Sequence, residues 1–362
     1  MEKFTLLAIA VLASLNILTA LNIFLIRLRN DRVGQKMVSL EKSYDALINE
    51  ARLGEVDTNK VRGLLSRRHY PYFQRYLRKR ISGTYGPDPS VERRIASLSG
   101  FSNHLRDRTL KSAGWKKALD LRTLSYLRDK ENIPAFRQIL RTENHFPCLL
   151  AASYGLALCG DTRSLQLIAD KVFDRKRPNR DQLLAVLHSF GPEAAPEIHT
   201  FIDEEFLPED KATVLVDLLA LYRYRPAGPT LERIVQRTAS PELKIHAVEA
   251  LGLIGHEESI EILQLLLEDE DFRVRLKTVR SLALLDGERN RAKLKAMLED
   301  DNEWVRLNAA EAMLENLKTG EKVLRDFSDS DSARAGHIAR LVLLDNDFNR
   351  KRWRYKHEAF AS

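Results

Sequence analysis

Three stretches of the sequence repeat one pattern: LKIHAVEAL at 243–251, VRLKTVRSL at 274–282 and VRLNAAEAM at 305–313. Successive stretches begin 31 residues apart, and apolar residues recur within each at the three- and four-residue steps of a helix face. A fixed period of this length indicates supersecondary units that stack on their neighbours. The sequence therefore predicts an all-α fold built from repeats.

Each unit is predicted to be a helical hairpin. Ser240 is placed to cap a helix whose first turn contains Pro241, and Gly255 is placed to end it in a left-handed conformation. Ser259 is then expected to cap a second, shorter helix that begins near Ile260. Because such a hairpin is apolar on two sides, it is stable only when neighbours cover both.

The same rhythm extends over most of the chain. The turns that follow the first helices are expected near Asp129, Gly160, Gly191, Tyr222 to Arg225, Gly255, Asp286 and Leu317. This pattern resembles HEAT repeats, particularly the short bacterial type named from phycobilisome lyases, over about residues 112–345. The resemblance implies a right-handed α-solenoid of seven to eight hairpins, with the second helix of each pair on a concave, partner-binding face.

The first 26 residues predict a membrane anchor. The 23 residues 4–26 carry no charge and span roughly 34 Å as a helix, enough to cross a hydrocarbon core of about 30 Å. A cleaved signal peptide is the alternative, but the run is too long, no small-x-small site closes it, and arginines follow at once. The cations that follow place the rest of the chain in the cytoplasm, on a single-pass protein of the cell inner membrane: Arg27, Arg29, Arg32 and Lys36.

Three polar residues lie along one stripe of this span. Asn16, Thr19 and Asn22 follow one another at three-residue steps, and an amide in lipid is costly unless it has a partner. We interpret them as candidate contacts with another transmembrane helix. A single span that simply tolerates these groups is the alternative.

Four regions are predicted: an anchor at 1–29, a basic helical juxtamembrane or capping region at 30–111, a HEAT-like solenoid at 112–349 and a basic aromatic tail at 350–362. Apolar residues at heptad spacing from Met37 to Ala51 predict a helix that packs on the first repeat or forms a short coiled coil.

Charge is distributed unevenly along the chain, although the net charge is only +7. Residues 60–130 hold eighteen basic and five acidic residues, whereas residues 191–349 hold 20 basic and 32 acidic residues. The basic stretch can contact an anionic membrane or a protein, or it can be a solvated helix face. No nucleic-acid-binding motif accompanies it, so nucleic acid is an unlikely partner. The acidic region predicts a basic segment as ligand.

Three departures from the repeat are candidates for function. One is the basic loop Arg175, Lys176, Arg177, Pro178, which is either an interface or a structural feature of the array. The turn Tyr222, Arg223, Tyr224, Arg225 puts aromatic and cationic groups where other units have small residues. It is either an interface or an insertion that bends the array. The tail RKRWRYK at 350–356, with Trp353 and Tyr355, can bind lipid or an acidic partner, fold back, or stay disordered.

Nothing in the sequence predicts catalysis, and we expect no cofactor and no metal. The His-Glu pairs are His256-Glu257, in a predicted turn, and His357-Glu358 in the tail, too few for the di-iron site of HEAT-like hydroxylases. No phosphate loop, GxSxG motif or useful Cys-His spacing is found. Cys148 and Cys159 lie in apolar stretches and are expected to be reduced core residues.

The leading hypothesis is therefore a non-catalytic, membrane-anchored scaffold that binds partner proteins. A more specific form makes it the accessory subunit of a membrane enzyme complex, such as an envelope polysaccharide synthase, so that its partner is itself a membrane protein. The third hypothesis is an enzyme of the HEAT-like lyase or hydroxylase type.

Overall fold

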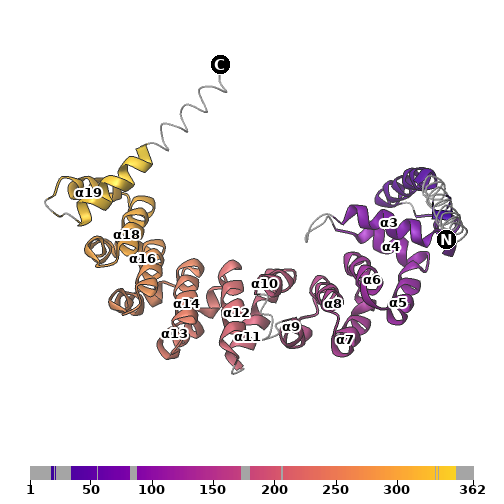
Figure 1. The fold of residues 1–362 in the computed structure, drawn as a ribbon, viewed down its shortest axis with the longest axis horizontal. Coiled ribbons are helices and arrows are strands. Elements are labelled where there is room, and N and C mark those ends of the chain that lie inside the picture. The colour runs from indigo at the N-terminus through magenta and orange to yellow at the C-terminus, as the bar shows by residue number, and fades with distance from the viewer. Residues whose placement is uncertain are drawn as a thin grey trace, which may run out of the picture. The chain divides into compact units, whose positions relative to one another are not determined.

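The computed structural model describes residues 34–54, 56–81, 88–172, 180–204, 207–330 and 334–347, together with residues 18, 19, 21 and 332 (Figure 1). Every regular element within these ranges is a helix, as the repeat pattern predicts. The chain divides into two compact units, Met1–Cys159 and Gly160–Ser362.

The first unit begins with a helix over 34–52. The helices that follow it are α2 (Thr58–Leu64), α3 (Tyr70–Arg80), α4 (Ser90–Leu98), α5 (Phe101–Lys111), α6 (Gly114–Leu127), α7 (Ile133–Thr142) and α8 (Phe146–Leu158). Packed aromatic rings join helix 34–52 to α3 and α3 to α5. The ring centroids of Tyr44 and Phe73 lie 5.3 Å apart, and those of Phe73 and Phe101 lie 5.2 Å apart. The heptad-spaced seam of helix 34–52 thus packs on its neighbours in this unit.

The second unit alternates longer and shorter helices. They are α9 (Leu165–Val172), α10 (Arg180–His188), α11 (Ala195–Glu204), α12 (Glu209–Leu221), α13 (Gly228–Arg237), α14 (Pro241–Ile254), α15 (Ile260–Leu265), α16 (Phe272–Asp286), α17 (Arg291–Ala296), α18 (Glu303–Asn316), α19 (Gly320–Ser328) and a last helix over 334–347. The long helices α10, α12, α14, α16 and α18 pack side by side in chain order (Figure 1). The hairpins therefore stack as the period predicts.

The predicted ends of helix α14 are confirmed. It begins where Ser240 Oγ accepts the Leu243 N–H at 3.2 Å, and it ends at Gly255, whose φ of 73° is left-handed. Helices α16 and α18 begin 31 and 62 residues after Pro241. Local capping chemistry and the repeat period therefore agree.

The predicted cap at Ser259 is wrong. The Ser259 hydroxyl donates to Glu232 Oε1 at 2.6 Å and makes no capping bond at the start of α15. The cause is a 3-10 turn at Glu257–Ser259, which turns the side chain into the fold and buries it completely. The hydroxyl therefore joins two hairpins instead of capping one helix.

Neighbouring long helices approach closely through small residues. A Cβ on Gly252 would lie 2.7 Å from Ser281 Oγ and 2.8 Å from Ser281 Cα. The Ser281 hydroxyl donates to the Val248 carbonyl at 2.8 Å across the same contact between α14 and α16. In the first unit, Ser125 Oγ donates to the Ala151 carbonyl at 2.7 Å in the corresponding way. A small residue and a serine thus fix the spacing of stacked hairpins.

Within the described ranges, no helix has the length and apolar character required to cross a bilayer. The predicted span 4–26 falls almost entirely outside these ranges. Of its three candidate contact residues, Asn16 and Asn22 lie outside the described residues, and Thr19 is exposed.

Candidate functional site

The long helices share one face that is exposed or half-buried at most positions, although Tyr126 and Val214 on it are buried. Most of them end at a residue with left-handed φ, namely Arg128, Gly160, Arg223 and Gly255, which aligns the repeats. The positions 13, 9, 6 and 2 residues before it lie at four- and three-residue steps, so they project from one side of the helix. None of these four positions in α14 is buried: Glu242, His246, Glu249 and Leu253. We call the surface formed by these positions the long-helix face.

In the second unit, the long-helix face is cross-linked by ion pairs between successive helices. His246 Nδ1 lies 2.6 Å from Asp217 Oδ1, and Lys277 Nζ lies 2.6 Å from Glu249 Oε1. Further pairs join α10 to α12, α14 to α16 and α16 to α18: Arg180 with Asp217, Glu242 with Arg273, and Arg280 with Glu311. Much of the acidic surplus on this face is therefore neutralised by neighbouring repeats.

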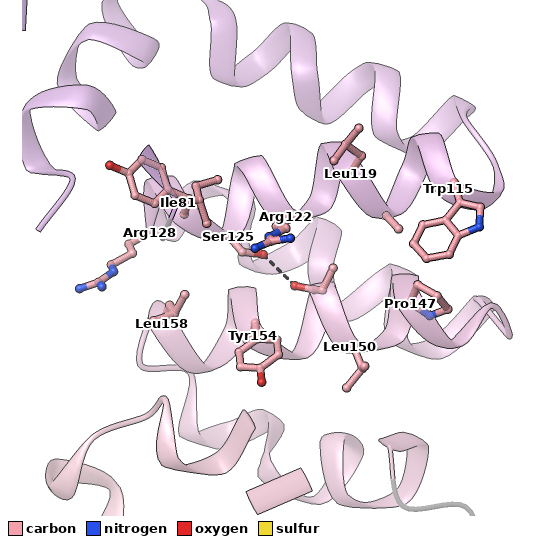
Figure 2. Close-up of a pocket in the computed structure, with 13 residues that line it drawn as sticks. Ile81, Trp115, Leu119, Arg122, Ser125, Arg128, Pro147, Leu150, Tyr154 and Leu158 are labelled. Carbon is pink, nitrogen blue, oxygen red and sulfur yellow. Dashed lines mark hydrogen bonds between the residues drawn. The ribbon is translucent and has the colours of Figure 1, made fainter. Parts of the chain in front are cut away.

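In the first unit, the same positions carry mostly apolar side chains. They are Trp115, Leu119, Arg122 and Tyr126 on α6, and Pro147, Ala151, Tyr154 and Leu158 on α8. Between the two helices lies a groove of about 550 Å³, to which Leu150 and Ile81 also contribute (Figure 2). The positions of Leu119 and Arg122 in α6 thus carry the paired groups His246 and Glu249 in α14, whereas the last position is apolar in both helices, Tyr126 and Leu253.

The floor of this groove is rigid. The bond from the Ser125 hydroxyl to the Ala151 carbonyl crosses it from α6 to α8 (Figure 2). Beneath it, a Cβ on Gly155 would lie 2.6 Å from the Phe136 ring of α7, so this position has no room for a side chain. The groove therefore lies over a closely packed contact between helices.

Large apolar groups line the groove at its open side. Trp115 is 75% exposed, and its ring makes an edge contact with that of His145 at 6.0 Å. Leu119 is 39% exposed, whereas Leu150 and Leu158 are half-buried. Burial raises the pKa of the half-buried Tyr154, which stays a neutral phenol. An apolar depression with an exposed tryptophan is typical of a protein-binding site.

The charged residues that line the groove are both arginines. Arg122 is exposed at the middle of α6, and Arg128 lies at its end. Among the residues that the structure describes, Arg122 has no acidic partner. An occupant of the groove therefore meets apolar surface and positive charge together.

The candidate turn 222–225 packs back on earlier helices. The Tyr222 hydroxyl donates to the His188 carbonyl at 3.1 Å, and the Tyr224 ring contacts that of His199 at a centroid distance of 5.8 Å. Arg223 and Arg225 are exposed. The tyrosines thus join two hairpins, and partner binding by this turn stays a prediction. The basic loop 175–178 and the tail candidates Trp353 and Tyr355 lie outside the described residues.

Two side-chain clusters combine residue types used in catalysis. His145 Nδ1 lies 3.3 Å from Cys148 Sγ, a pairing that the sequence analysis missed although the two residues are only three positions apart. Burial, and then the nearby Glu143 charge, raises the pKa of the fully buried Cys148, which therefore stays a thiol. This environment is the opposite of the one that activates a cysteine nucleophile.

Glu232, His256 and Ser259 form the second cluster. His256 Nδ1 lies 2.7 Å from Ser259 Oγ and 3.4 Å from Glu232 Oε1, so both partners share one ring nitrogen. The other ring nitrogen, Nε2, lies 3.6 Å from Glu258 Oε2, so a hydroxyl and a carboxylate face different nitrogens as in a catalytic triad. The Ser259 hydroxyl, however, donates to Glu232 and is not exposed to a substrate. With Ser259 fully buried, the cluster joins α13 to the next hairpin. Across the described ranges, no group of three or more His, Cys, Asp or Glu side chains is placed to hold a metal ion.

Several cations of the basic stretch are paired across helices. Arg108 Nη2 lies 2.6 Å from Asp120 Oδ1, and the Lys117 ammonium lies 2.8 Å from Glu143 Oε2. The bond from Lys117 holds the pKa of Glu143 below its usual range. Helix 34–52 supplies further carboxylates, which pair with Lys60, Lys79 and Arg80. The surplus of positive charge on this surface is thus smaller than the count of its residues suggests.

Comparisons with known proteins identify the repeat. A family model of HEAT repeats matches residues 228–315, which hold α13 to α18. A search of curated proteins found no match. Among solved structures, the complex of CpcE and CpcF of phycocyanin lyase from Nostoc sp. PCC7120 is similar at 16% identity, over 79% of this chain and 94% of that chain, with a TM-score of 0.19. Residues 228–315 thus match HEAT repeats, and every regular element of the residues that the structure describes is a helix.

Proposed function

We propose that this protein is a non-catalytic scaffold, anchored in the inner membrane by its first residues, that binds partner proteins on the long-helix face of its HEAT-like repeats in the cytoplasm. One observation carries the proposal: the long-helix face forms an apolar groove over α6 and α8, whereas ion pairs link successive helices at several of the same positions in α14, α16 and α18. HEAT repeats in general mediate contacts between proteins.

The contrast between the units supports binding because repeat architecture alone does not require it. A long-helix face can be made of charged side chains that satisfy one another, as in the second unit. The exposed side chains of Trp115 and Leu119 instead place apolar area in water, which is unfavourable in free energy and lowers solubility. A partner that covers this area offsets the cost.

Crosslinking in intact membranes tests the binding surface. We expect a photoreactive phenylalanine analogue at Trp115, Leu119 or Leu150 of the full-length protein to yield one common adduct. The matched control is Leu265 of α15, which is 77% exposed but lies outside the groove. Adducts that form equally at Leu265, or none at the three groove positions, would contradict the proposal.

Removal of residues 1–29 tests the anchor separately. The uncharged run 4–26 favours membrane insertion, so the shortened protein is expected to move from the membrane pellet to the supernatant after carbonate extraction. Partition is measured by immunoblot, with an integral membrane protein as reference. Retention of the shortened protein in the pellet would show that another part of the chain holds it there.

A further inference from the structure

The groove over α6 and α8 restricts the chemistry of its partner. We propose that it binds an amphipathic helix that carries acidic residues beside its apolar stripe, on a partner protein. This inference rests on the proposed function and adds the nature of the occupant.

The surface around the groove is formed by helices, which limits how a peptide can pair its backbone there. Peptides add to a folded domain either as a strand on a sheet edge or as a helix or extended segment in a groove. The described residues contain no strand, so this surface offers no edge with unpaired backbone groups. An occupant of the groove must therefore satisfy its own backbone hydrogen bonds, and a helix does so.

The length of the groove along α6 suits a short helix. From Trp115 to Arg128, helix α6 rises about 20 Å at 1.5 Å per residue. A helix of roughly 13 residues covers this distance and presents apolar side chains at i, i+3 or i+4, and i+7. The apolar side chains that receive them come from both walls: Trp115 and Leu119 from α6, and Leu150 and Leu158 from α8.

The charged side chains that line the groove are positive. No acidic residue lines the groove within the described part of the chain, while Arg122 and Arg128 lie six residues apart on one wall, a rise of about 9 Å. A carboxylate on the occupant can accept bidentate hydrogen bonds from the Arg122 guanidinium, and the charge of Arg128 adds to the attraction. Such complementarity selects an acidic helix and excludes a basic one.

The same charge argument excludes the tail of this chain as the occupant. The segment RKRWRYK at 350–356 carries five cations and would bring them against Arg122 and Arg128. Like charges so placed are repelled, which costs binding energy. An acidic segment from another protein is attracted to these arginines instead of being repelled by them.

A pair of designed peptides tests the occupant on the full-length protein in detergent micelles. Each labelled 13-residue helix carries leucines at i, i+3, i+7 and i+10, and its flanks carry glutamates in one peptide and lysines in the other. We expect the glutamate peptide to bind at least about tenfold more tightly by fluorescence anisotropy. Arg122→Glu is expected to reverse this preference, whereas Arg280→Glu in the second unit leaves it unchanged.

Each outcome bears on the inference. Equal binding of the two peptides, or no effect of Arg122→Glu in a variant with unchanged circular dichroism, would overturn the acidic helix. Self-association that competes with the peptide in light scattering would assign the groove to a second copy instead. Because crosslinking at Trp115 reports any partner, the proposed function can survive when the charge preference fails, and the two failures are distinguishable.

Discussion

Replacing Arg275 with methionine is expected to lower the free energy of unfolding of the second unit by about 3–5 kcal/mol. Arg275 Nε lies 2.8 Å from Asp300 Oδ2, and its Nη2 lies 2.9 Å from Oδ1, so the pair is bidentate. The side chains are 16% and 7% exposed. Methionine keeps most of the side-chain volume but leaves the Asp300 carboxylate buried without its cation. Urea unfolding followed by circular dichroism measures the change.

The exposed pair Arg280–Glu311 is the matched control for this substitution. It also joins α16 to α18, but its side chains are 51% and 42% exposed, so Arg280→Met is expected to change stability by less than about 1 kcal/mol. Arg275→Met combined with Asp300→Leu is expected to recover most of the loss, because neither charge then remains buried alone. Equal effects of the two single substitutions would contradict the buried-pair account.

The Arg275–Asp300 pair also predicts a loss of stability in acid. Burial alone would raise the pKa of Asp300, but the bonds donated by Arg275 and by the Asn302 N–H outweigh burial and hold this pKa below its usual range. A carboxyl whose folded-state pKa is depressed stabilises the fold at pH above its unfolded pKa, about 3.9. This contribution is lost as pH falls from about 4 through the folded-state pKa. Arg275→Met should therefore flatten the acid limb of the stability curve.

Gly252→Ala is expected to destabilise the protein by about 1–3 kcal/mol. The added methyl would lie 2.8 Å from Ser281 Cα, which belongs to the backbone and cannot rotate away. Helices α14 and α16 must then separate, which also lengthens the bond from the Ser281 hydroxyl to the Val248 carbonyl. Thermal unfolding monitored by circular dichroism measures the loss, and hydrogen exchange locates it.

Gly63→Ala is expected to change the free energy of unfolding in the opposite direction, although the chemical change is the same. Gly63 also lies inside a helix, α2, but a Cβ there would meet nothing within 4 Å. Alanine is a better helix former than glycine by about 1 kcal/mol, so this variant should be slightly more stable than the parent. If both alanine variants shift stability in the same direction, the close approach of α14 and α16 does not limit this position.

The repeats were predictable because their signals are local. Ser240 and Gly255 mark the ends of α14 by short-range hydrogen bonding and by backbone geometry, and neither depends on distant residues. Ser259 was mispredicted for the complementary reason. Its hydroxyl can either cap α15 or donate to Glu232, which is 27 residues away in the sequence. The packing of the hairpins brings Glu232 within reach, so the long-range bond forms.

The groove was not predictable from periodicity, since an apolar residue on a helix signals burial in the same way whether or not a neighbour covers it. Trp115 and Leu119 fit the pattern of a core-facing stripe, yet both are exposed. Alignment of the repeats on their left-handed turn residues places Trp115 and Leu119 opposite Glu242 and His246 of α14, but opposite Pro147 and Ala151 of α8. Likewise, counts of acidic residues in 191–349 overstate free surface charge because many carboxylates pair with the next repeat.

The left-handed residues that end α6 and α12 are arginines, although glycine occupies the same place after α8 and α14. For a residue with a Cβ, the left-handed conformation costs about 1 kcal/mol or more in conformational free energy relative to glycine. At position 128 the concession keeps a guanidinium at the mouth of the groove, where glycine would offer none. Replacing Arg128 with glycine is therefore expected to raise the free energy of unfolding while removing a charged group that lines the groove.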